Sequence, residues 1–212
     1  MPLASLLIVE DEILARTTLA TALVHGGFQV VGSVSSAPAA LEVAKEFLPE
    51  VALLDLDLGL GPTGIDVAVA LRKLIPRIGI VFLTTFLDPR FSKADNLTLP
   101  RGSRYLSKQD TGGISKVAST ILQAKFHPLT GDAMASKASE LNEHQIAVLK
   151  LLAAGLSNLE IAKKLGVSEK AVEHLITRIA KTLGIARDKS QNLRVQLVRK
   201  YSAFVGKDLP ES

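Results

Sequence analysis

The 212-residue sequence contains no cysteine, which excludes a disulfide framework and a thiolate metal site. Its four histidines show no spacing typical of metal ligands. No uninterrupted apolar run reaches the roughly 18 residues that a membrane span needs. The apolar run near the N-terminus is short, has no basic region before it and stops at three acidic residues, so it does not resemble a signal peptide. We therefore expect a soluble, cytoplasmic protein without a membrane partner.

Excess positive charge is confined to the C-terminal third of the chain. Residues 1–138 hold 13 basic and 13 acidic side chains, whereas residues 139–212 hold 12 basic and 8 acidic ones, which accounts for the net charge of +4. A positive field in one small region fits a polyanionic partner, although an ordinary basic surface gives the same count. Charge alone leaves both interpretations open.

Residues 1–125 alternate between short apolar runs and longer segments with helical periodicity. This alternation is typical of repeated βα units, and near-continuous runs of Val, Ile and Leu indicate parallel strands that are buried on both faces. We predict an α/β domain, (βα)5, with a doubly wound parallel sheet and strands at 6–9, 28–33, 51–55, 78–84 and 104–107. The fourth helix is the exception, because segment 88–102 carries only one helical turn's worth of pattern before turn-forming residues, which predicts an irregular loop.

Residues 126–138 lack periodicity and contain Pro128, Gly131 and several small side chains, which predicts a linker. Residues 139–207 then carry helical patterns only, at 142–154, 158–165, 169–183 and 191–205. Single glycines separate the first three of these segments, and Ser168 is a suitable N-cap for the third. This succession of short helices predicts a four-helix, all-α domain that contains a helix-turn-helix.

Polar side chains gather where the predicted strands end. Those at the ends of the first, third, fourth and fifth strands are Glu10 and Asp11, Asp55, Thr84, and Ser107 with Lys108. Ligands of an open parallel α/β sheet bind at this edge. Three carboxylates at one edge would repel one another without a cation, and an oxygen-only site suits Mg²⁺. A lysine and a hydroxyl group beside them could bind phosphoryl oxygens.

In these residues and in their order, the first 125 positions resemble the receiver domains of bacterial response regulators, which have a flavodoxin-like fold. The resemblance implies that Asp55 is the nucleophile that accepts a phosphoryl group from a sensor histidine kinase. It also implies that Glu10, Asp11 and Asp55 hold Mg²⁺, with help from the backbone carbonyl of Asp57.

The same resemblance implies roles for three further residues. Lys108 would bind the phosphate, and Thr84 and Tyr105 would be the switch pair, since Tyr105 lies three residues before Lys108 as it does in the family. Two positions depart from the family pattern here: Thr85 stands where a small residue normally follows the switch hydroxyl, and Gln109 replaces a common proline.

The loop after Asp55 also departs from the pattern. Gly59 stands where a proline is common, and Gly64 lies one residue later than usual. These departures leave the loop geometry and the access to Asp55 open. A rival interpretation is an aspartyl-phosphate phosphohydrolase, because Asp55-Leu56-Asp57 also resembles the DxD motif of haloacid-dehalogenase-like enzymes. That motif normally ends in Thr or Val where Gly59 stands, and Asp57 would point away from Asp55 if the strand continued. We therefore expect a protein that is not an enzyme.

From Leu141 to Ile185 the chain resembles a LuxR-type helix-turn-helix. The most specific segments are Gly-Leu-Ser-Asn at 155–158, Glu-Ile-Ala at 160–162 and Val-Ser-Glu-Lys-Ala-Val-Glu-His at 167–174. Gln145 stands where this family usually has Glu, so we expect a polar contact between helices to differ. The final helix would close the small core, and in the resembled family it also makes the dimer on DNA.

Apolar residues recur every three or four positions from Val172 to Leu183 and are expected to face the core of this domain. The opposite face would enter the major groove of DNA. From the motif positions we expect base contacts by Glu173, His174 and Thr177, and phosphate contacts by Lys170, Arg178 and Lys181. Glu173 can accept a hydrogen bond from a cytosine amino group or pair with a neighbouring cation.

Together the two halves resemble the NarL/FixJ family of response regulators. The resemblance implies that phosphorylation of Asp55 shifts the receiver toward a form that promotes dimerisation or releases the recognition helix. A homodimer would then bind two half-sites on double-stranded DNA. The alternative from another class is a phosphorylation-independent DNA-binding dimer, whose receiver serves for assembly or ligand sensing.

Overall fold

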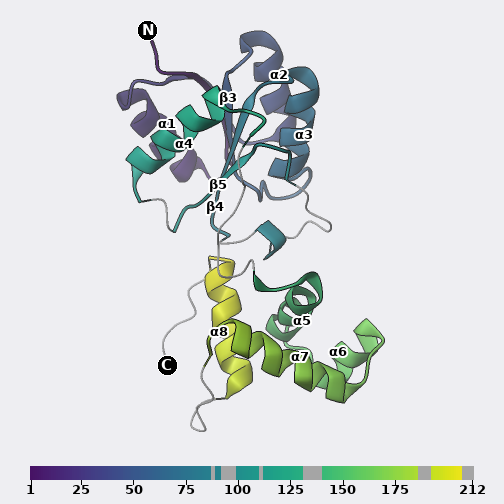
Figure 1. The fold of residues 1–212 in the computed structure, drawn as a ribbon. Coiled ribbons are helices and arrows are strands. Elements are labelled where there is room, and N and C mark those ends of the chain that lie inside the picture. Colours follow the sequence, from purple (N-terminus) through teal and green to yellow (C-terminus); the bar gives the residue numbers. More distant parts are fainter. Residues whose placement is uncertain (87–88, 92–98, 110–111, 131–139, 186–191, 207–212) are drawn as a thin grey trace. The chain divides into compact units, whose positions relative to one another are not determined.

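The structure, a computed structural model, describes residues 1–86, 89–91, 99–109, 112–130, 140–185 and 192–206 (Figure 1). It contains two units. The first comprises Met1–Thr85 and Ser92–Met134, and the second comprises Phe86–Phe91 and Ala135–Ser212. A short segment from the middle of the first unit's sequence therefore belongs to the second unit.

The first unit contains a five-stranded parallel sheet in the order β2-β1-β3-β4-β5. The strands are β1 (Ser5–Val9), β2 (Gln29–Val34), β3 (Val51–Leu54), β4 (Gly79–Thr84) and β5 (Arg104–Ser107). Every residue of β3 and β4 is buried, as expected for central strands that are covered on both faces. The predicted doubly wound sheet is confirmed, and the predicted strands agree to within one residue at each end. Strand order reverses between β1 and β3, which places a crevice at the carboxyl ends of these two strands.

Four helices cover the sheet: α1 (Ile13–His25), α2 (Ala37–Phe47), α3 (Gly64–Leu74) and α4 (Ile114–Phe126). Helices α1 and α4 lie on one face, and α2 and α3 lie on the other (Figure 1). The main core lies under the first pair, where Leu23, Val117 and Ile121 pack against strand residues such as Ile8 and Leu53. Alternate residues of the buried strands serve the two faces, because successive side chains of a strand point to opposite sides.

The chain that follows α4 stays attached to the first unit as far as Thr130. The guanidinium group of Arg72 donates to the carbonyl of Pro128, and Arg104 Nη1 donates to the carbonyl of Thr130 at 2.7 Å. Gly102 allows this approach, because a Cβ atom there would lie 2.4 Å from the backbone of Leu129. The predicted linker therefore begins as an anchored segment, and its residues 131–138 lie outside the described ones.

Segment 88–102 contains one turn of 3-10 helix, η1 (Pro89–Phe91), among its described residues. This agrees with the irregular connection predicted there, although residues 92–98 lie outside the described part. The second unit otherwise consists of α5 (Glu143–Ala153), α6 (Asn158–Leu165), α7 (Glu169–Thr182) and α8 (Leu193–Phe204). The four predicted helices are confirmed to within two residues at each end.

Each helix of the second unit begins at a residue whose side chain accepts a backbone hydrogen bond. These N-caps are Asn142, Ser157, Ser168 and Asn192. Such caps satisfy N–H groups that have no partner within the helix. None of the helices in the described residues is both long and apolar enough to cross a membrane.

Candidate functional site

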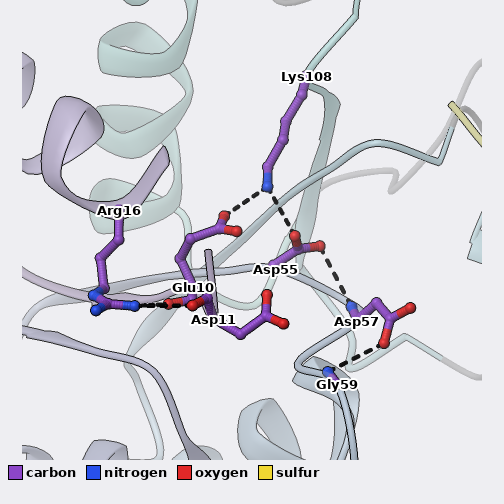
Figure 2. A network of polar contacts seen from close by, with 7 residues as sticks. All are labelled: Glu10, Asp11, Arg16, Asp55, Asp57, Gly59 and Lys108. Carbon is purple, nitrogen blue, oxygen red and sulfur yellow. Dashed lines mark hydrogen bonds and ion pairs between the residues drawn. The ribbon is translucent and has the colours of Figure 1, made fainter. Parts of the chain in front are cut away.

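Three carboxylates meet at the carboxyl ends of β1 and β3. Glu10 and Asp11 follow β1 and Asp55 follows β3, and these strands are hydrogen-bonded neighbours with Val9 opposite Leu54. One oxygen from each carboxylate lies within 4.8 Å of the others, as Figure 2 shows. Glu10 is only 3% exposed and Asp55 only 7% exposed. The structure thus brings together the acidic residues that the sequence singled out.

Lys108, which follows β5, reaches into this cluster (Figure 2). Its Nζ lies 2.6 Å from Glu10 Oε2 and 2.8 Å from Asp55 Oδ2. Burial, together with the charge of Asp55, holds the pKa of Glu10 above its ordinary value despite the lysine. Burial alone would lower the pKa of Lys108, but the interactions with Asp55 and Glu10 outweigh it and raise that pKa. One ammonium group against three carboxylates leaves net negative charge in a largely buried place, where a hard divalent cation fits.

The loop after Asp55 keeps close to that residue. Gly64 N donates to the carbonyl of Leu56 at 3.0 Å, and a Cβ atom on Gly64 would lie 1.8 Å from the carbonyl oxygen of Asp55. Gly64 therefore provides the close approach even though it lies one residue later than usual. Gly59 has a φ of 81°, which a proline cannot adopt because its ring fixes φ near −65°. The departure at Gly59 thus reflects a different loop conformation.

The carboxylate of Asp57 turns toward its own loop (Figure 2). Asp57 Oδ1 accepts from Gly59 N at 3.2 Å, and Asp57 N lies 3.4 Å from Asp55 Oδ1 as a donor. Within the described residues, the cluster of possible metal ligands comprises Glu10, Asp11 and Asp55. This arrangement argues against the DxD phosphohydrolase, in which the second aspartate would act beside the first.

Thr84, the last residue of β4, has a buried hydroxyl group. The residue is fully buried, and its Oγ1 has no hydrogen-bond partner in the part of the chain that the structure describes. A buried polar group without a protein partner costs free energy unless water or a ligand supplies the hydrogen bond. The carbonyl of Thr84 accepts from Lys108 N at 2.7 Å, which ties these two residues together. Tyr105 is half-buried on β5, opposite Phe82 of β4.

Arg16 is a site residue that the sequence analysis missed. Its Nη1 donates to the carbonyl of Glu10 at 2.6 Å and to that of Asp11 at 3.2 Å (Figure 2). Because Arg16 lies in the first turn of α1, its side chain reaches back over the residues that link β1 to α1. It holds the backbone that carries two of the three carboxylates. A basic residue five positions after Asp11, in the first turn of the following helix, was the signal that could have identified it.

In the second unit, α7 presents one apolar face and one polar face. Val172, Ile176 and Ile179 are buried, as predicted. The six residues expected to contact DNA are all exposed: Lys170, Glu173, His174, Thr177, Arg178 and Lys181. The hydroxyl of Thr177 donates to the carbonyl of Glu173 at 3.0 Å, so its methyl group and its acceptor lone pairs are what it can offer to a base.

Gln145 completes the N-terminal cap of α5. Its Oε1 accepts from Asn142 N and its own N donates to Asn142 Oδ1, both at 2.9 Å. This reciprocal pair is a capping box, in which glutamine and glutamate are equally suitable. The departure from the family's glutamate is therefore accommodated locally, at the start of one helix.

Two family models match the sequence of this chain. The model of the response regulator receiver domain matches residues 6–110, and the model of the luxR family of bacterial regulatory proteins matches residues 139–195. The transcriptional regulatory protein LnrK of Bacillus subtilis is 27% identical over 207 residues, which cover 88% of this chain and 93% of LnrK. The oxygen regulatory protein NreC of Staphylococcus aureus is 25% identical over 217 residues, which cover 94% of this chain and 99% of NreC.

A solved structure of two RcsB dimers bound to two parallel DNAs has the same fold, with a TM-score of 0.59 and 20% identity over 95% of this chain and 98% of that one. The fold and the two matched domains define a response regulator with a LuxR-type DNA-binding domain. This chain belongs to the NarL/FixJ family of such regulators.

Proposed function

We propose that this protein is the cytoplasmic response regulator of a two-component system, in which a sensor histidine kinase phosphorylates Asp55 and thereby controls sequence-specific DNA binding and transcription. The observation that carries the proposal is the pairing of a carboxylate cluster, in which Glu10 and Asp55 are buried, with the buried hydroxyl of Thr84 that has no partner among the described residues. The cluster supplies a nucleophile and cation ligands, and the hydroxyl can donate to a phosphoryl oxygen.

The phosphorylation step follows from this arrangement. A carboxylate oxygen of Asp55 attacks the phosphorus of a phosphohistidine; the P–N bond breaks and an acyl phosphate forms. Mg²⁺ bound by Glu10, Asp11, Asp55 and the carbonyl of Asp57 would neutralise the phosphoryl oxygens. Lys108 Nζ, already 2.8 Å from Asp55 Oδ2, donates to a phosphoryl oxygen.

The switch uses the remaining residues. Thr84 turns its hydroxyl toward another phosphoryl oxygen and donates a hydrogen bond to it. Tyr105, on the neighbouring strand, then moves into the space that Thr84 leaves. Phosphorylation acts as a population shift, because it stabilises the form in which these contacts exist.

The output is DNA binding by α7. The exposed face of α7 enters the major groove, with Glu173, His174 and Thr177 toward the bases and the three basic residues toward the phosphates. A homodimer, formed at least when the protein is phosphorylated, places two such helices on two half-sites. The RcsB structures, in which dimers bind DNA, support this arrangement.

The phosphorylation test is intact-protein mass spectrometry after incubation with Mg²⁺ and acetyl phosphate. We expect the wild type and Asp57→Asn to gain one phosphoryl group, since Asp57→Asn keeps its backbone carbonyl, whereas Asp55→Asn gains none. DNA binding, followed in parallel, should tighten only where the adduct forms. A folded wild-type protein that binds DNA without forming an adduct would favour the phosphorylation-independent dimer, whose receiver serves for assembly or ligand sensing.

The DNA-binding test compares Lys181→Ala with Lys45→Ala, which removes the same charge from an exposed position on α2. We expect Lys181→Ala to weaken binding to all sequences and to lower the salt dependence of binding by about one counterion. Lys45→Ala should change neither quantity. Equal effects of the two substitutions would contradict the assignment of α7 to the groove.

A further inference from the structure

Phe91, in the connection after β4, is a core residue of the second unit. It is 3% exposed and stacks on Phe204, which is 4% exposed, with ring centroids 5.0 Å apart and planes inclined by 17°. The ring of Tyr201 is edge-to-face with that of Phe91, with ring centroids 5.7 Å apart and planes inclined by 79°. Offset-stacked and edge-to-face pairs of this kind stabilise beyond the area that they bury. The last turns of α8 thus pack against a residue that comes from the middle of the chain.

The neighbouring residue, Arg90, attaches the same turn to the start of α5. Its Nη1 donates to the carbonyl of Leu141 at 2.7 Å and lies 3.6 Å from Glu143 Oε1. Leu141 is buried, whereas Glu143 is highly exposed, so the hydrogen bond is the more specific of the two contacts. Helices α5 and α8 pack against each other, and η1 contacts one end of each.

The connection from the switch residue to this turn is short. Thr84 ends β4, and Phe86 is the first residue that belongs to the second unit. The anchored residues Arg90 and Phe91 lie six and seven positions after Thr84, and seven residues span at most about 25 Å. The later connection is longer: residues 131–139 alone can span roughly 30 Å when extended. The connection through Thr85 therefore contains fewer residues than the later one.

We propose that the connection from Thr84 to the anchored turn Pro89–Phe91, here called the strap, transmits the state of the phosphorylation site to α5 and α8. The strap is held at one end by β4 and at the other by Phe91 and Arg90. When Thr84 shifts toward a phosphoryl group on Asp55, the change passes along the strap to Phe91 and alters how firmly α8 packs. This inference rests on the proposed function and adds the physical route by which the receiver acts on the DNA-binding unit.

The test is amide hydrogen exchange of the full-length chain, with and without Mg²⁺ and beryllofluoride as the phosphoryl mimic. Four proteins are compared: the wild type, Phe91→Ala, a variant with two glycines inserted between Thr85 and Phe86, and Phe47→Ala. Phe47 is a half-exposed phenylalanine on α2 and serves as the control for loss of a ring. The insertion keeps Phe91 and lengthens only the strap, so it decides the matter even if Phe91→Ala fails to fold.

Without beryllofluoride we expect Phe91→Ala to accelerate exchange in α8 by roughly a hundredfold, because deleting a buried ring opens the unit. The insertion and Phe47→Ala should leave that exchange unchanged. With beryllofluoride, exchange in α8 should change in the wild type and in Phe47→Ala but not in the insertion variant, while the residues around Lys108 respond in all of them.

Three results would overturn the proposal. Unchanged α8 exchange in a folded Phe91→Ala would mean that the strap does not hold α8. A response of α8 to beryllofluoride in the insertion variant as large as that in the wild type would mean that the signal takes another route. If the residues around Lys108 do not respond even in the wild type, the phosphorylation site itself is refuted and the strap's role falls with it. The first two results leave the proposed function intact.

Discussion

Glu10 and Glu50 lie at opposite ends of the same sheet, and each contacts a lysine, yet their pKa values shift in opposite directions. Glu10 follows β1 and lies 2.6 Å from Lys108, whereas Glu50 precedes β3 and lies 2.9 Å from Lys125. The pKa of Glu10 is raised and that of Glu50 is lowered. The presence of a lysine partner therefore does not by itself fix the direction of the pKa shift.

The other neighbours of each carboxylate explain the difference. Glu10 is buried and lies beside another carboxylate, that of Asp55, and both factors disfavour its charged form. For Glu50 slight burial also raises the pKa, but hydrogen bonds from Lys125 and from the backbone of Ser5 outweigh it. One end of the sheet is satisfied by its own donors and serves stability. The other end is left short of positive charge and of hydrogen bonds, which is the condition of a site that awaits a ligand.

The largest expected effect comes from removing Lys108, the lysine at the end of the sheet that holds Glu10. Lys108→Met leaves Glu10 and Asp55 buried without their cation, and breaking a largely buried pair in this way costs about 3 kcal/mol of unfolding free energy. Urea unfolding of the receiver measures this loss, and Mg²⁺ should restore part of it in the variant. The matched change at the other end, Lys125→Met, exposes a carboxylate that water can solvate, and should cost less than about 1 kcal/mol. Equal losses would show that the two ends do not differ.

A smaller effect of opposite sign is expected at Thr84. Thr84→Val replaces an unpartnered buried hydroxyl by a methyl group of similar shape, and should stabilise the unphosphorylated receiver by about 1 kcal/mol. The control is Thr120→Val, since the hydroxyl of Thr120 donates to the carbonyl of Lys116 at 2.8 Å. That substitution should be neutral or destabilising. Destabilisation by Thr84→Val, measured by the same urea unfolding, would mean that the hydroxyl already has a partner.

The carboxylate cluster and Lys108, at the carboxyl ends of the strands, were also the features that the sequence predicted best. Parallel strands bring their carboxyl ends to one edge, so the residues that follow β1, β3 and β5 had to meet once the strands were recognised. Long buried runs of Val, Ile and Leu make such strands recognisable, and single glycines mark the ends of the short helices in the second unit. Both signals are local, which is why the boundaries agree to within one or two residues.

The features that the sequence did not predict depend on contacts between distant or backbone groups. Arg16 acts through two carbonyls, which no side-chain motif encodes. The cap made by Gln145 requires knowledge of where α5 begins. Phe91 is one phenylalanine in an irregular connection, and no local pattern tells which of two cores it joins. Only the placement of Phe91 follows from tertiary packing, whereas Arg16 and Gln145 bond to backbone groups within six residues along the chain.

The smallest expected effect concerns Glu50, at the opposite end of the sheet, and is the pH dependence of its contribution to stability. Because the folded-state pKa of Glu50 is lowered, its contribution to stability is present above the unfolded-state value of 4.5 and is lost as the pH falls through the folded-state value. Glu50→Gln should therefore lower the unfolding free energy by about 0.5 kcal/mol at neutral pH, since the residue is 44% exposed and solvent weakens its ion pair. The difference from the wild type should vanish as the pH drops below 4.5. In a Lys125→Met background the substitution should cost less, because the principal partner is already gone. A difference that persists in acid would mean that Glu50 stabilises the sheet by packing, and the contrast with Glu10 would no longer be one of charge.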